Sequence, residues 1–119
     1  MEALKNQIFS LSGGIRYVAI YANDKLISGE KPSIQNTSSS ESDKYEELIV
    51  NPTLLKLVIQ RGNIDCGGVE YVIIKYGFFF EFLMPIKNGH VSVGIEQLSN
   101  IMEIINKIQD LVKAEGFYD

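Results

Sequence analysis

The sequence predicts an α+β fold built on an antiparallel sheet, with elements in the order α-β-β-α-β-β-β-α. Apolar residues recur at spacings of three and four, typical of a helix, near the start, in the middle and at the end of the chain. Runs rich in β-branched and aromatic residues indicate two strands before the middle helix and three after it. Short turns join these strands, which suits antiparallel neighbours. A chain of 119 residues is expected to form a single domain spanning 1–119.

The first elements are predicted to be a helix and a hairpin. Residues 2–12 carry apolar side chains on one helical face, and the glycine pair at 13–14 ends the helix. Residues 15–21, Ile-Arg-Tyr-Val-Ala-Ile-Tyr, form a strand. The Asn-Asp pair at 23–24 supplies a turn, and residues 25–29 return as the second strand.

Residues 30–43 interrupt this pattern. The segment is rich in serine and holds one large apolar residue, Ile34, so it buries too little surface to offset the entropy of ordering. It is predicted to be a flexible, exposed loop. A loop that is phosphorylated or that closes over a ligand is the alternative.

Helical spacing resumes at Tyr45 and meets a proline. Asn51 suits an N-cap and Pro52 the first position of a helix, so a second helical piece is predicted at 52–61, ended by Gly62. Proline also disfavours helical geometry in the residue before it. The middle helix is therefore predicted to break or kink at Pro52.

The last third predicts three strands and a helix. The strands are expected at 69–76, 78–84 and 90–96, and Asn88-Gly89 is a strong signal for a hairpin turn. Apolar residues occupy both faces of these strands, so both faces of the sheet are expected to be covered. An amphipathic helix follows at 100–115.

Few residues offer chemistry. His90, the one histidine, follows the hairpin turn and is predicted to be exposed, with a general base as the alternative. Glu81 lies within the phenylalanine-rich run 78–82 and is predicted to be a solvated strand residue, with a polar site as the alternative. Cys66 is predicted to be a loop or partly buried thiol, and Gly67-Gly68 a turn, since no helix or lysine follows to hold a phosphate. No metal site is expected, because structural zinc usually takes four nitrogen or sulfur ligands and the chain has one histidine and one cysteine. No catalytic or cofactor site is expected either, because no motif for one is found.

Charge and cysteine content narrow the function classes. The net charge is -4 and the basic residues are scattered, which disfavours nucleic-acid binding. The longest apolar stretches are far shorter than the roughly 20 residues of a membrane-spanning helix, so no membrane insertion is expected. One cysteine allows no internal disulfide and favours a reducing compartment, and hence a cytoplasmic protein.

The whole chain resembles the roadblock (dynein light chain) family, a profilin-like domain. Residues 15–21 with Lys25-Leu26-Ile27-Ser28-Gly29 look like the first hairpin of that family. The segment 68–77, Gly-Val-Glu-Tyr-Val-Ile-Ile-Lys-Tyr-Gly, resembles its third strand, and Met84-Pro85-Ile86 the exit from its fourth. The chain is also similar to small uncharacterised archaeal proteins with the same hairpin. The motifs are hydrophobic patterns, not catalytic residues.

The resemblance implies a five-stranded antiparallel sheet flanked by helices and a non-enzymatic, dimeric scaffold or regulator, often of small GTPases. Dimers of the family join through the middle helix and the third strand. Carried over by position, the dimer surface is Tyr45, Leu48, Ile49, Val69, Tyr71 and Ile73. A third strand at the edge of the sheet would also favour pairing on physical grounds, because only Glu70 interrupts its apolar residues.

A second interpretation is a domain that senses a small molecule. Its pocket would lie between the sheet and a helix, lined by Phe78, Phe79, Phe80 and Phe82. Core packing is the simpler interpretation of these phenylalanines.

Overall fold

The computed structural model describes residues 1–31 and 40–118. Within them lie five strands, four α-helices and one π-helical segment, η2. The elements in chain order are α1 (Glu2–Phe9), β1 (Ile15–Ala22), β2 (Lys25–Glu30), α2 (Ser40–Tyr45), η2 (Glu46–Val50), α3 (Asn51–Asp65), β3 (Val72–Lys75), β4 (Phe79–Ile86), β5 (Gly89–Glu96) and α4 (Ile101–Ala114). No helix in this part of the chain is long and apolar enough to cross a membrane.

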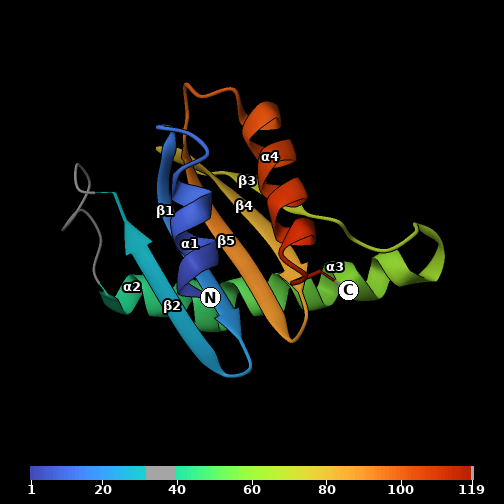
Figure 1. Ribbon diagram of the computed structural model, residues 1–119. Helices are drawn as coiled ribbons and strands as arrows, with labels where there is room; N and C mark the ends of the chain where they lie inside the picture. Colours follow the sequence, from blue (N-terminus) through green and yellow to red (C-terminus); the bar gives the residue numbers. More distant parts are fainter. Residues whose placement is uncertain (32–39, 119) are drawn as a thin grey trace.

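The strands form one antiparallel sheet in the order β2-β1-β5-β4-β3 (Figure 1). This arrangement confirms the predicted α+β class. Two hairpins, β1-β2 and β4-β5, meet where β1 pairs with β5, so the centre of the sheet joins the two halves of the chain. The short strand β3 forms one edge, which meets the condition for pairing through that strand, and β2 forms the other.

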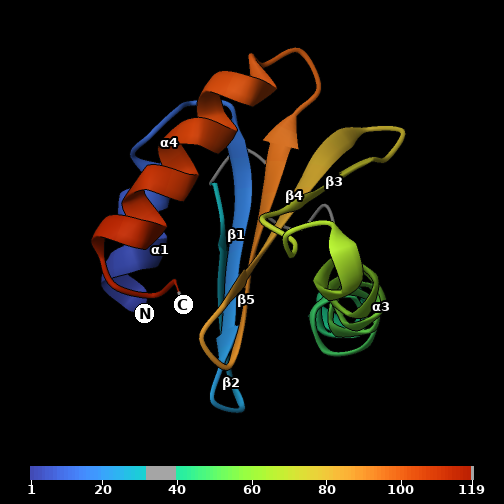
Figure 2. The same cartoon turned by 90° about the vertical axis from the view of Figure 1, so that its right-hand side faces the viewer.

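Helices cover both faces of the sheet, as the apolar pattern predicts. Figure 2 shows α1 and α4 on one face and the middle helix, made of α2, η2 and α3, on the other. The main hydrophobic core lies under α1 and α4, because alternate strand residues point to that face. Its fully buried side chains include Ile8, Val18, Ile20, Phe82, Met84, Val91, Val93, Ile95, Ile105 and Ile108.

The middle helix does not break at Pro52, and that prediction was wrong. Figure 1 shows α2, η2 and α3 as one rod. The π-helical turn directly before Pro52 uses i to i+5 hydrogen bonds, such as the bond from the Asn51 N–H to the Glu46 carbonyl. This wider register carries the helix past a residue that has no N–H to donate. Asn51 is thus not an N-cap; its backbone is helical and its side chain is fully buried.

The helix also continues through Gly62 to Asp65. A Cβ at Gly62 would lie 3.1 Å from the backbone carbon of Gly68 and from Cγ2 of Val69, so this glycine permits close packing instead of ending the helix. Gly67 and Gly68, predicted to form a turn, follow the end of α3, and both have positive φ angles.

Element bounds differ from prediction in two other places. β3 covers Val72–Lys75, a shorter strand than the predicted 69–76, and Phe78 lies outside β4. Most of the predicted loop at 30–43 falls outside the described residues. At its described ends Glu30 belongs to β2 and residues 40–43 to α2, so the loop prediction was wrong for these residues.

The two hairpin turns use different chemistry. Asn23 and Asp24 both have positive φ angles of 53° and 64°, the conformation that a tight two-residue turn requires. In the second hairpin the turn is Lys87-Asn88, not Asn88-Gly89, and Gly89 is the first residue of β5. A Cβ on Gly89 would lie only 1.7 Å from the carbonyl oxygen of Tyr21. Gly89 therefore allows β1 and β5 to approach each other.

Replacing Gly89 with alanine should destabilise the sheet at its centre. We expect the free energy of unfolding to fall by at least about 2 kcal/mol in urea denaturation, because backbone atoms must move to admit the methyl group. Gly13→Ala is the matched control, since a Cβ there has no neighbour within 4 Å. Equal stabilities of the two variants would contradict this role for Gly89.

Candidate functional site

The sheet face beneath the middle helix carries an unusual set of buried polar side chains. Each of the five is at most 2 % exposed. They are Glu47 of η2, Asn51 of α3, Glu81 of β4, and His90 and Ser92 of β5. Burying polar groups is costly unless each is hydrogen-bonded, so their partners determine whether this face is stable.

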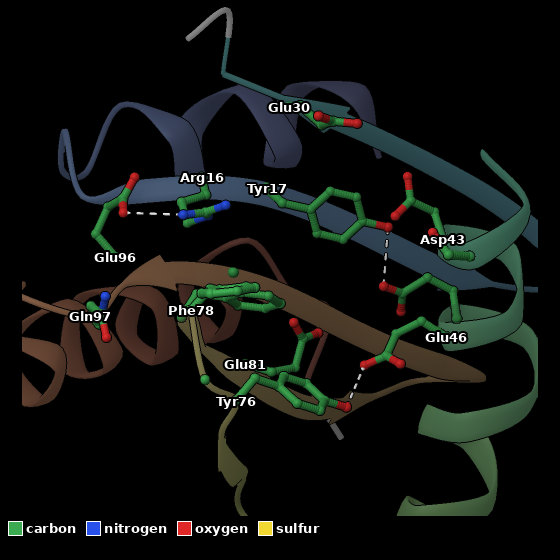
Figure 3. Close-up of a pocket in the computed structure, with 15 residues that line it drawn as sticks. Arg16, Tyr17, Glu30, Asp43, Glu46, Tyr76, Phe78, Glu81, Glu96 and Gln97 are labelled. Carbon is green, nitrogen blue, oxygen red and sulfur yellow. Dashed lines mark hydrogen bonds and ion pairs between the residues drawn. The ribbon is translucent and has the colours of Figure 1, made fainter. Parts of the chain in front are cut away.

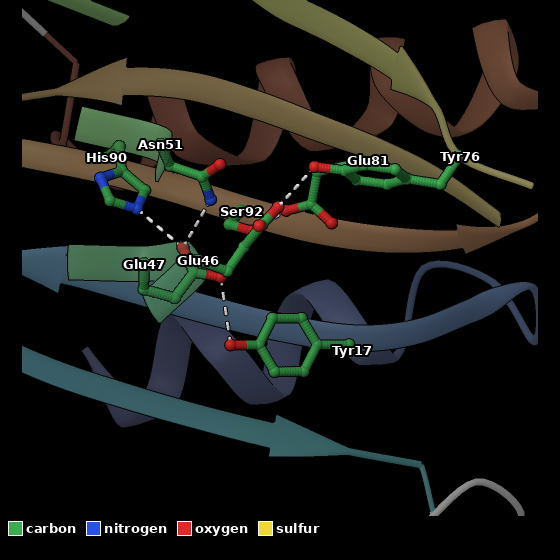
Figure 4. Close-up of polar contacts among 8 residues, drawn as sticks. All are labelled: Tyr17, Glu46, Glu47, Asn51, Tyr76, Glu81, His90 and Ser92. Atoms are coloured by element: carbon green, nitrogen blue, oxygen red, sulfur yellow. Dashed lines mark hydrogen bonds and ion pairs between the residues drawn. The ribbon is translucent and has the colours of Figure 1, made fainter. Parts of the chain in front are cut away.

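Glu47 is the centre of this cluster (Figure 4). Its Oε2 accepts a hydrogen bond of 3.1 Å from the hydroxyl of Tyr17. Its Oε1 accepts one of 2.9 Å from Nδ2 of Asn51 and lies 2.9 Å from Nε2 of His90. These contacts join the middle helix to β1 and β5. Burial beside Glu47 raises the pKa of the Tyr17 hydroxyl far above its ordinary value.

His90 is buried, so the prediction of an exposed hairpin histidine was wrong. β5 lies inside the sheet between β1 and β4, and the middle helix covers the face to which His90 points. Its ring also lies 5.9 Å from the ring of Tyr21, centroid to centroid. His90 thus contacts Glu47 inside the fold, away from the surface that a hairpin position suggested.

Glu81 is likewise buried, and the prediction of a solvated strand residue was wrong. The Ser92 hydroxyl donates a hydrogen bond to its carboxyl group. Burial is the largest cause that raises the pKa of Glu81, and the negative charges of Glu47 and Glu46 add to it; the hydrogen bonds from Ser92 and Asn51 lower the pKa, and the net value is about 8. Glu81 therefore holds a proton at neutral pH.

A cavity of about 920 Å³ opens beside this cluster, between the sheet and the N-terminal part of the middle helix. Figure 3 shows Arg16 and Tyr17 on one side, Tyr76 and Glu81 on the other, and Glu46 on the helix. Its charged and aromatic lining consists of Arg16, Tyr17, Glu30, Asp43, Glu46, Glu47, Tyr76, Phe78, Phe79, Glu81 and Glu96. The wall is thus both acidic and aromatic.

Two walls of this cavity are linked through Tyr76. Its hydroxyl donates a hydrogen bond of 3.0 Å to Oε1 of Glu46. Burial, together with the nearby negative charge of Glu46, raises the pKa of Tyr76 to about 12. Burial also raises the pKa of Glu46. The link holds the loop before β4 against the middle helix.

The residues predicted for a dimer surface fall into two groups. Tyr45, Leu48 and Ile49 are exposed on the middle helix. Tyr71 and Ile73 are half-buried and pack against the core under α4, while Val69 contacts the region of Gly62. The structure therefore leaves the helix residues open to a partner, whereas the side chains near β3 are partly used within the fold.

The remaining candidates add little chemistry. Cys66 is an exposed thiol at the end of α3, and its sulfur lies 3.3 Å from a carboxylate oxygen of Asp65. Phe82 is core as predicted, whereas Phe78 is 80 % exposed at the cavity. Among residues 1–31 and 40–118 no cluster of histidine, cysteine and acidic side chains is arranged to hold a metal ion.

Sequence reasoning missed Glu47, Asn51, Tyr17 and Ser92. A signal for them was present: Glu47 and Asn51 are four residues apart and share a helical face. His90 and Ser92 alternate along one strand and so share a face of the sheet. Polar residues at matching positions on a helix and a strand indicate a buried polar layer between them.

The raised pKa of Glu81 predicts a stability that depends on pH. Its ordinary pKa is 4.5, so between about pH 4.5 and 8 the folded chain binds a proton that the unfolded chain has lost. The stability from this group is complete below the ordinary pKa and is lost progressively as the pH rises to about 8, a change on the order of 5 kcal/mol. Glu81→Gln cannot ionise, so its advantage in free energy of unfolding over the unaltered protein should grow between pH 5 and 8.5.

Chemical denaturation at several pH values measures this difference. Glu103→Gln, an exposed change on α4, is the control and should show no such trend. Parallel pH profiles for the two variants would contradict a buried, protonated Glu81.

Comparisons with known proteins agree on the architecture. No protein-family model matches the chain, and no curated protein matches it. Among solved structures, a Roadblock/LC7 domain from Streptomyces avermitilis matches with a TM-score of 0.73 and 13% identity, over 96% of this chain and 92% of that one. Myxococcus xanthus MglB matches with a TM-score of 0.62 and 13% identity, over 95% and 91%. At these identities the likeness establishes the fold: the chain folds as a roadblock/LC7 domain, as its sequence pattern predicts.

Proposed function

We propose that this protein is a non-enzymatic, single-domain regulatory module that forms a homodimer and binds a protein partner in the cytoplasm, with small GTPases as the first candidates. The observation that carries the proposal is an exposed apolar stripe along the middle helix. The roadblock family, which the chain resembles, supports both the dimer and the choice of GTPases. The single cysteine suits a reducing compartment.

The helix stripe consists of Tyr45, Leu48, Ile49, Leu57 and Ile64, which are between 43 % and 75 % exposed. The buried residues of the same helix are Glu47, Asn51, Leu55 and Gly62. Four members of the stripe lie two residues from a buried position, about half a turn away, and so face away from the sheet. Large apolar residues gathered on one exposed face mark an interaction surface.

A second copy of the chain is the occupant that the fold favours. The edge strand β3 pairs only with β4, so the backbone groups on its outer side have no strand partner among the described residues. A two-fold axis beside β3 would let the strand pair with its own copy in antiparallel fashion. The same axis would bring the two middle helices side by side.

Introducing a charged side chain into the helix stripe should separate the dimer into monomers. We expect Ile49→Asp and Leu57→Asp to run as monomers in size-exclusion chromatography with light scattering, while the unaltered protein has twice the 13.4 kDa chain mass. Ile73 is a poorer site for this test, because its side chain packs against the core. Met102→Asp is the control, since Met102 is 47 % exposed on α4 and should leave the dimer intact. A monomeric parent protein would contradict the proposal.

The GTPase assignment has its own test. Small GTPases encoded in the same genome, loaded with GDP or a non-hydrolysable GTP analogue, can be measured for binding by biolayer interferometry. A regulator should prefer one nucleotide state of one GTPase by at least about tenfold, a coupling of roughly 1.4 kcal/mol. A dimer that binds none of them would leave the dimeric module supported but would exclude small GTPases as its partners.

The cavity supports a second candidate function, the sensing of a small molecule. Its volume of about 920 Å³ is within the range of ligand pockets, roughly 300–1,000 Å³. It lies between the sheet and the middle helix, where the ligand-sensing interpretation places a pocket. Of the phenylalanines expected to line it, Phe78 and Phe79 do so, whereas Phe82 belongs to the core on the other face.

A further inference from the structure

We propose that the cavity beside η2 binds an organic cation, namely a primary ammonium or guanidinium group carried on an apolar stem. The inference goes beyond the regulatory dimer and rests on the second candidate function, ligand binding. It follows from the charges that line the cavity, from one unpaired buried oxygen, and from the aromatic rings of the wall.

The lining contains six carboxyl groups and a single cation, Arg16. Arg16 is already held by Glu96, at 3.3 Å between Nη1 and Oε2, and Lys31 holds the other oxygen of Glu96 at 2.7 Å. Glu30 and Glu46 form no ion pair within residues 1–31 and 40–118. Glu81 carries a proton at neutral pH, so it needs no cation. The cavity thus brings the carboxyl groups of Glu30 and Glu46 together, and no cation among the described residues pairs with them.

Glu30 has an oxygen that needs a donor. Its Oε2 is buried and has no hydrogen-bond partner in the part of the chain that the structure describes. Burial and the neighbouring Asp43 raise the pKa of Glu30, and burial with Glu47 and Asp43 raises that of Glu46, although Tyr76 lowers it. A buried acceptor without a donor is unfavourable, so a ligand with N–H groups would gain by reaching it. An ammonium or guanidinium group brings both the donors and the positive charge.

Aromatic side chains make up much of the rest of the wall. Tyr17, Tyr76, Phe78 and Phe79 line the cavity, and the Arg16 guanidinium already lies over the Phe79 ring at 5.3 Å from its centroid. A ring face attracts a cation in this geometry. Phe78 is 80 % exposed, so its ring is free to cover the apolar stem of a ligand.

Other ligand classes fit less well. Anions would be repelled by the carboxyl groups. A metal ion would need clustered ligands, and the described residues contain no such group of histidine, cysteine and acidic side chains. The combination of hydrogen-bond acceptors and ring faces suits a cation that is polar at one end and apolar at the other.

Butylguanidinium and its neutral isostere butylurea provide the matched probes. Titration of the ¹⁵N-labelled full chain with butylguanidinium should shift amide signals around the cavity, those of Tyr17, Gly77 and Gly94 among them, and leave those of α4 unchanged. Butylurea should cause no saturable shifts there. Equal responses to the two compounds, or shifts outside the cavity, would overturn the proposal.

Variants test the assigned groups. Glu46→Gln should weaken binding of butylguanidinium by about tenfold, since it removes a charge at the site. Phe78→Ala should weaken it by about fivefold without harming the fold, because this ring is exposed. Glu41→Gln, the same charge change on an exposed residue of α2 outside the lining, is the control and should bind as the unaltered chain does. If Glu41→Gln and Glu46→Gln weaken binding equally, diffuse charge explains the effect and the site is excluded.

A peptide probe distinguishes two sources of the cation, a free metabolite and an arginine side chain of a partner protein. The peptide acetyl-Gly-Arg-Gly-amide presents the same head group as a protein side chain would. Binding of the peptide at least as tight as that of butylguanidinium assigns the site to a partner's arginine, and exclusion of the peptide assigns it to a free metabolite. Because the titration does not depend on oligomeric state, a monomeric protein that binds butylguanidinium would retain this site while contradicting the dimer.

Discussion

The carboxyl group of Glu47 is the contact through which the middle helix is attached to the sheet. It is fully buried and receives Tyr17 from β1, His90 from β5 and Asn51 from the next helical turn. Removing one partner of such a group leaves an unpaired polar atom away from water, which costs more than the hydrogen bond itself contributes. The arrangement therefore fixes the rotation of the helix. That rotation in turn directs Glu46 toward the cavity and the helix stripe toward solvent.

The two sides of one helix thus serve different purposes. Its inner side, with Glu46 and Glu47, forms the wall of the acidic and aromatic cavity. Its outer side carries the helix stripe, which we propose contacts a second copy of the chain. The π-helical turn lies between α2 and α3 and contains both Glu47 and Ile49, so the polar anchor and part of the helix stripe come from the same five residues. A change in the packing of this turn would therefore alter both the cavity wall and the helix stripe.

Features that depend on local chemistry were predicted only in part from the sequence: the break at Pro52 and the helix end at Gly62 were wrong, because the helix continues through both. The Asn23-Asp24 turn and the order of the strands follow from residue type and spacing, and the structure has both. Features that depend on distant partners were not predicted. His90 follows a hairpin turn, which suggested exposure, yet its strand lies within the sheet and a helix from residues about 40 positions earlier covers it. Glu81 was misjudged for the same reason, because nothing nearby in the chain reveals Ser92 as its donor.

The pairing of β1 with β5 also has a consequence for synthesis of the chain. Ala22 at the end of β1 lies opposite Gly89, roughly 70 residues later. At translation rates of about 5–20 residues per second, the first hairpin is made several seconds before its partner strand exists. During that time the inner edge of β1, with Val18 and Ile20, has no strand to pair with. The centre of this sheet can therefore close only after residues 89–96 have been made, whatever the stability of the first hairpin.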